Sequence, residues 1–130
     1  MNRFLWYWLP AILWMALIFA LSTRQNVSVS EEFVIDFLVL KSLHMVFYSI
    51  LYFLLFRALY SQKKKQSSTE DVLMKTALVA IVYAATDELH QMFVPTRTGR
   101  LQDVVIDSIA IFLMYSYIKY NFRKLKHLII

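Results

Sequence analysis

Apolar residues fall into four long runs along this chain, and short polar segments separate them. The runs cover about residues 4–22, 37–60, 72–94 and 101–118. About 20 helical residues cross the hydrocarbon core of a bilayer, and a helix satisfies its own backbone hydrogen bonds there. The pattern therefore predicts an all-α polytopic membrane protein, with four transmembrane helices forming one domain over residues 1–130.

The composition also favours lipid as the solvent. The chain is 59% hydrophobic and 18% charged, with a mean hydropathy of +0.52. A soluble domain of this size has no core large enough to bury so much apolar surface. The alternative for the first run is a signal peptide cleaved near Ala20 and Ser22, but the run is long for one.

The basic residues predict an orientation. The loop 61–71 contains Lys63, Lys64 and Lys65, and the tail 119–130 contains Arg123, Lys124 and Lys126. Lysine and arginine favour the cytoplasmic side of a membrane, so we expect both segments and both termini inside. An amphipathic tail lying on anionic lipid is the alternative. The net charge of +5 is explained by these flanks, and we expect no nucleic-acid partner.

Strongly polar residues inside the runs all fall near the predicted outer end. Lys41, His44 and Tyr48 follow one helical face at i, i+3 and i+7. Asp87 with Gln91, and Asp103 with Asp107, are each spaced i, i+4. A charged side chain facing lipid at the middle of a span costs about 2.5 kcal/mol or more. We therefore expect these groups to turn inward and form one outward-facing polar pocket, together with Glu88 and the loop residues Arg97 and Arg100.

The pocket residues suggest two kinds of chemistry. His44, Asp87 and Glu88 are the candidate catalytic residues, with His44 as acid or base and a carboxylate orienting it or acting as nucleophile. The candidate binding residues for an anionic group are Lys41, Tyr48, Gln91, Arg97, Arg100, Asp103 and Asp107. No diagnostic metal spacing is present, so we predict no metal site, and the cofactor stays open. His90 ranks below His44. The alternative without chemistry is a polar brace that joins the helices.

Three ordered motifs carry a family resemblance. They are Leu21-Ser22 before a Ser-rich stretch, Lys41-x-x-His44-x-x-x-Tyr48-x-x-Leu51, and Asp87-Glu88-x-x-Gln91-x-Phe93-Val94-Pro95-x-Arg97-x-Gly99, which continues to Asp103-Val104 and Asp107. On these residues the chain resembles the VanZ-like family of small bacterial membrane proteins. It departs at Phe47, where many members have an acidic residue, and at Ala110 and Met114, where glycines are common.

The resemblance implies a multi-pass protein of the bacterial plasma membrane. The name-giving member is associated with low-level resistance to the glycopeptide teicoplanin, so an effect on teicoplanin susceptibility is an expectation for this chain. We expect the pocket to bind or process an anionic cell-envelope lipid or lipid-linked precursor. An intramembrane hydrolase or transferase using His44, and a structural or regulatory partner, are the alternatives. Whether the protein is an enzyme or forms a homo-oligomer stays open, and four helices are few for a transporter.

Overall fold

The fold is known from a computed structural model that describes residues 2–25, 28, 31–97 and 99–130, without the side chains of Arg3 and Phe33. Its elements are α1 (Arg3–Ser22), α2 (Phe33–Ser61), α3 (Thr69–Gln91) and α4 (Leu101–Ile129). No strand occurs among these described residues. The predicted all-α class is confirmed.

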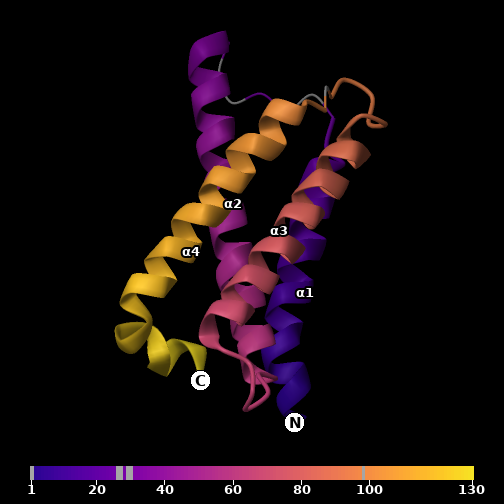
Figure 1. Ribbon diagram of the computed structural model, residues 1–130. Helices are drawn as coiled ribbons and strands as arrows, with labels where there is room; N and C mark the ends of the chain where they lie inside the picture. The colour runs from indigo at the N-terminus through magenta and orange to yellow at the C-terminus, as the bar shows by residue number, and fades with distance from the viewer. Residues whose placement is uncertain (1, 26–27, 29–30, 98) are drawn as a thin grey trace.

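The four helices alternate in direction, so that both termini lie at one end of the bundle (Figure 1). As a result α2 and α4 run in the same direction, and both begin at the opposite end. The loop that joins α3 to α4 also lies at that opposite end. All three places where the sequence concentrates polar residues, the start of α2, the end of α3 and the start of α4, therefore meet there.

Three helices are long and apolar enough to cross a membrane, over Phe4–Ser22, Val34–Ser61 and Leu101–Ile129. The chain is thus a membrane protein by its helices. The third helix has polar residues at both ends, and it is packed among the others. Its 23 residues are about 34 Å long at 1.5 Å per residue. Its length therefore suits a transmembrane span. That α3 is the remaining one of the four predicted spans stays a prediction, as does the orientation of the protein in the membrane.

The helix bounds differ from the expected runs in two informative places. The second helix begins at Phe33 rather than near 37, because Phe33, Val34 and Ile35 are apolar enough to extend it beyond the charged residue Asp36. The last helix continues to Ile129, through most of the expected tail. Figure 1 shows its final turns bending in toward the other helices, where the Tyr7 hydroxyl donates to the Ile130 carbonyl at 2.9 Å.

The core is built around α2, with large side chains facing small ones. Tyr48, Leu51 and Tyr52 are fully buried, and alanines of α3 and α4 such as Ala80 and Ala110 lie at 0% exposure. The Ser49 hydroxyl donates to the Ala110 carbonyl at 3.5 Å. The departure from glycine at Ala110 therefore leaves α2 and α4 in close contact, since a buried alanine also permits close helix approach.

Candidate functional site

A cavity of about 390 Å³ lies at the end of the bundle away from the termini. Residues from all four helices and from the α3–α4 loop line it. Its wall has an apolar part, including Leu21, Phe47 and Ile106, and a polar part that holds four basic side chains, Arg24, Lys41, Arg97 and Arg100. This combination is suited to an amphiphilic molecule with an anionic group.

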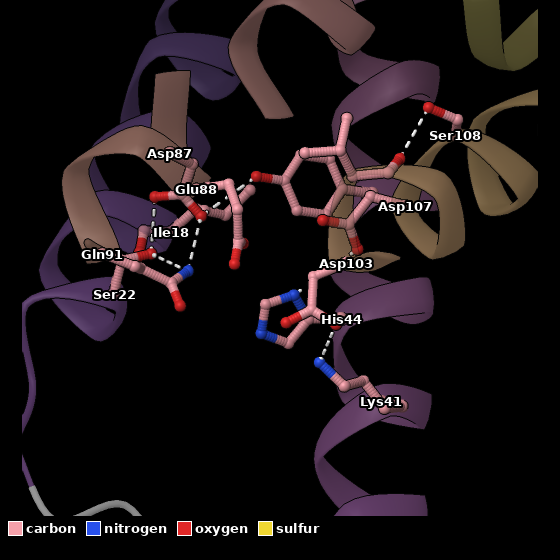
Figure 2. A network of polar contacts seen from close by, with 12 residues as sticks. Ile18, Ser22, Lys41, His44, Asp87, Glu88, Gln91, Asp103, Asp107 and Ser108 are labelled. Atoms are coloured by element: carbon pink, nitrogen blue, oxygen red, sulfur yellow. Dashed lines mark hydrogen bonds and ion pairs between the residues drawn. The ribbon is translucent and has the colours of Figure 1, made fainter. Parts of the chain in front are cut away.

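Asp87 is the centre of a hydrogen-bond network on one side of the cavity (Figure 2). Its Oδ1 lies 2.6 Å from the Ser22 hydroxyl. Its Oδ2 accepts from the Tyr48 hydroxyl at 3.1 Å and from Gln91 Nε2 at 3.2 Å. The side chain is only 4% exposed. One carboxylate therefore joins α1, α2 and α3, and its partners hold it in a fixed orientation.

An ion pair and a histidine–carboxylate contact join α2 to α4 on the other side of the cavity. Lys41 pairs with Asp103, and His44 Nδ1 lies 3.4 Å from Asp107 Oδ1. The pairs are in register because α2 and α4 run in the same direction. Three residues along α2 and four along α4 both descend one helical turn, so the second pair lies beneath the first.

The expected partners of His44 were Asp87 or Glu88, and the structure instead brings Asp107 to it. Asp87 is engaged by the three donors above, and Glu88 Oε1 accepts from the Arg100 backbone amide at 2.5 Å. Each α3 carboxylate is thereby turned toward α1 or the α3–α4 loop. If a carboxylate orients His44, the geometry assigns that role to Asp107, which is 1% exposed.

The α3–α4 loop fits tightly over the end of α3. A Cβ on Gly99 would lie 2.6 Å from the Glu88 carbonyl oxygen, so only glycine permits this approach. Thr96, with φ of 68°, is in the left-handed region that β-branched residues rarely adopt. Arg97 Nη2 donates to the Leu21 carbonyl at 3.2 Å. These contacts hold the two loop arginines over the cavity.

Most of the predicted site residues come together. Those that line the cavity are Lys41, His44, Tyr48, Asp87, Gln91, Arg97, Arg100 and Asp103. Glu88 and Asp107 lie behind this wall, bonded to the loop and facing His44. His90 is directed away, with its ring 4.4 Å from that of Phe19 and its Nε2 3.2 Å from the Thr23 hydroxyl.

The cavity wall also contains residues that were not among the predicted ones, and these include Ser22, Arg24 and Asp36. Ser22 belongs to the Leu-Ser motif that closes the first helix, so a signal for it was present in the sequence. Arg24 and Asp36 lie in or beside a polar loop, where charged residues are ordinary. Their position depends on how α1 and α2 meet, which no local pattern indicates.

The structure also shows what Phe47 contacts at the position where the sequence departs from the family pattern. Its ring stacks on Trp14 with centroids 5.1 Å apart, and its carbonyl accepts from Trp14 Nε1 at 2.9 Å. An aromatic contact between α1 and α2 therefore occupies the position at which family members often have an acid.

Among the described residues, no group of three or more His, Cys, Asp or Glu side chains is arranged to hold a metal ion.

The fold and the cavity together define a small α-helical membrane protein with a polar pocket at one end of its bundle. The chain matches the VanZ/LLP1 family over residues 7–123. It therefore belongs to that family, as the motifs around His44 and Asp87 predicted. Searches of curated proteins and of solved structures each found no match.

Proposed function

We propose that the cavity binds the anionic head group of a cell-envelope lipid or lipid-linked precursor in the outer leaflet of the bacterial plasma membrane. The observation that carries the proposal is the set of four basic side chains on its wall, Arg24, Lys41, Arg97 and Arg100. Arginine binds phosphate through a planar fork of donors, and such charge-assisted bonds are strong where water is excluded.

The charge balance of the wall supports an anionic ligand. The wall holds three carboxylates, Asp36, Asp87 and Asp103, against its four basic side chains. Asp103 is paired with Lys41, and Asp87 accepts from neutral donors. The guanidinium groups of Arg97 and Arg100 have no carboxylate partner within ion-pair distance among the described residues. Both are therefore available to a phosphate.

The apolar part of the wall favours a lipid over a free anion. Leu21, Phe47 and Ile106 line the same cavity, and lipid chains surround the helices at that depth. A phosphorylated lipid can keep its chain in the bilayer and place its head group between the arginines. An effect on teicoplanin susceptibility would follow if the bound lipid belongs to the cell-wall pathway.

The test is a binding titration of the purified protein with a polyprenyl phosphate, with inorganic phosphate and with phosphatidylcholine. We expect saturable binding of the polyprenyl phosphate only, and an affinity at least roughly a hundredfold weaker in Arg97→Gln/Arg100→Gln, because each lost charge-assisted bond contributes about 1.5–3 kcal/mol and every 1.4 kcal/mol is tenfold in affinity. Lys75→Gln removes an exposed basic charge outside the cavity and is the control. Equal affinity in the pocket variant would contradict the proposal, whereas tight binding of inorganic phosphate would make the ligand a free anion.

The pair of His44 and Asp107 supports hydrolysis as a second candidate function. With Nδ1 directed at Asp107, Nε2 is the nitrogen left to take a proton from a water molecule in the cavity. That water would attack phosphorus, and the leaving oxygen would receive the proton from His44. Loss of phosphate release in His44→Gln, with lipid binding retained, supports this function, and full turnover in that variant excludes it.

A further inference from the structure

Charges are segregated between the two ends of the bundle. Of the nine acidic residues, only Glu70 and Asp71 lie at the end that holds the termini. Both are already engaged: Glu70 pairs with Lys119, and Asp71 forms a capping box with Ser68 at the start of α3. Among the described residues, none of the remaining basic side chains at this end lies within ion-pair distance of a carboxylate.

Six of these basic residues come from two segments far apart in the sequence. Lys63, Lys64 and Lys65 follow α2, and Arg123, Lys124 and Lys126 lie on the last turns of α4. The Phe122 ring lies 5.4 Å from that of Tyr60 and 6.4 Å from that of Phe56. This contact joins the end of α2 to the end of α4, so the two segments meet at one rim, which we call the basic collar.

The last turns of α4 have two distinct faces. Ile118, Phe122, Leu125 and Ile129 are spaced i, i+4, i+7 and i+11, which is one helical face, and they pack against the core. Arg123, Lys124 and Lys126 are exposed. Tyr117 and Tyr120 are 54% and 83% exposed, and tyrosine is enriched where a membrane meets water. The packed face fixes the helix and leaves the basic residues directed outward.

We propose that the basic collar is a second lipid site, which concentrates anionic phospholipids around the end of the bundle that holds the termini. Clusters of four to eight basic residues beside a membrane span attract anionic lipid, at about 1 kcal/mol per residue. The exposed tyrosines beside the charges favour a lipid surface over a soluble acidic partner, because tyrosine is enriched at the depth of the head groups. The collar is at the opposite end from the cavity, so the two sites act separately.

Tryptophan fluorescence can report on the collar alone. The three tryptophans are all in α1, and Trp6 and Trp8 flank Tyr7, which contacts the end of α4. In a Trp14→Phe background, quenching by brominated phosphatidylglycerol in vesicles of phosphatidylcholine measures enrichment of the anionic lipid beside these two residues. The vesicles contain no other protein, so a protein partner cannot produce the signal.

We expect phosphatidylglycerol to be enriched several-fold over phosphatidylcholine, and the enrichment to fall at high salt because exposed charges are screened. Arg123→Gln/Lys124→Gln/Lys126→Gln removes half of the collar's charge and should lower the enrichment clearly, because each basic residue contributes about 1 kcal/mol. Arg24→Gln/Arg97→Gln/Arg100→Gln removes equal charge from the cavity and should leave it unchanged. Inorganic phosphate at matched ionic strength should not compete.

Two results would overturn the proposal. One is equal quenching by phosphatidylglycerol and phosphatidylcholine in the parent protein. The other is an enrichment in the collar variant that equals that of the parent protein, with circular dichroism showing that the variant is folded. Because the cavity variant is measured in parallel, loss of collar binding and loss of cavity binding are distinguished.

Discussion

Asp87 accepts hydrogen bonds from side chains of three helices while lying almost entirely out of contact with solvent. A buried donor that loses its acceptor costs about 1–3 kcal/mol, so a single carboxylate here affects both the fold and the shape of the cavity. Sequence pattern alone predicted that Asp87 lies with the other polar residues near one end of the helices. It did not indicate which donors would meet the carboxylate, because the rotation of each helix depends on packing around Tyr48.

Asp87→Ala should therefore destabilise the protein by several kcal/mol, since Ser22, Tyr48 and Gln91 each lose an acceptor. Asp87→Asn should cost less, because its carbonyl oxygen still accepts. Thermal unfolding in detergent, followed by circular dichroism, measures both. Glu31→Ala, at an exposed residue, is the control and should leave the melting temperature unchanged. An equal effect of all three variants would contradict the network.

Gly99→Ala should displace the α3–α4 loop, because the added Cβ would lie 2.6 Å from the Glu88 carbonyl oxygen. The Arg100 amide would then leave Glu88, and both loop arginines would move from the cavity. We expect a lower melting temperature and weaker binding of a polyprenyl phosphate. Gln66→Ala in the other loop is the control. Unchanged binding would show that the loop position does not matter to the site.

At the scale of the helices, the register of α2 against α4 is the feature least accessible from sequence. The spacings of Lys41 with His44 and of Asp103 with Asp107 were visible as one face each. Assigning His44 to Asp107 needed the parallel direction and relative height of the two helices. The part-buried contact between Ser49 and Ala110 lies at the same seam between the two helices.

A double-mutant cycle tests this register. Lys41→Asp and Asp103→Lys should each destabilise the protein, because each leaves two like charges facing across a half-buried contact. The double variant should recover a large part of the loss, with a coupling energy of about 0.5–3 kcal/mol. Thermal unfolding measures all four proteins. Additive losses would show that α2 and α4 do not pair through these residues.

At the scale of the whole molecule, the all-α architecture and the gathering of polar residues at one end followed from hydropathy and charge. The length of the last helix could not be predicted in the same way. Its final segment, residues 119–129, is basic and only moderately apolar, and it is helical here through its packing against the other helices. The bend of α4 beneath the bundle was for the same reason outside what the pattern could indicate.

The predicted orientation can be tested directly, because the chain has no native cysteine. Single replacements Ser67→Cys, in the loop before α3, and Gln25→Cys, in the loop after α1, place one thiol at each end of the bundle. In intact cells, a membrane-impermeant maleimide should label only the cysteine at position 25. The position-67 thiol should react only after the cells are opened. The reverse pattern would invert the topology and place the cavity in the inner leaflet.

The central claim is that the cavity itself holds the lipid head group, and a replacement that fills it without changing charge tests this most directly. Ile106→Trp adds bulk to an apolar part of the wall. Ile109→Trp adds the same bulk to an exposed position that lies a little less than one turn further along α4. The affinity of each variant for a polyprenyl phosphate is the measurement. We expect Ile106→Trp to weaken binding roughly tenfold or more while Ile109→Trp binds as the parent protein does. Equal affinity in the two variants would contradict a ligand inside the cavity.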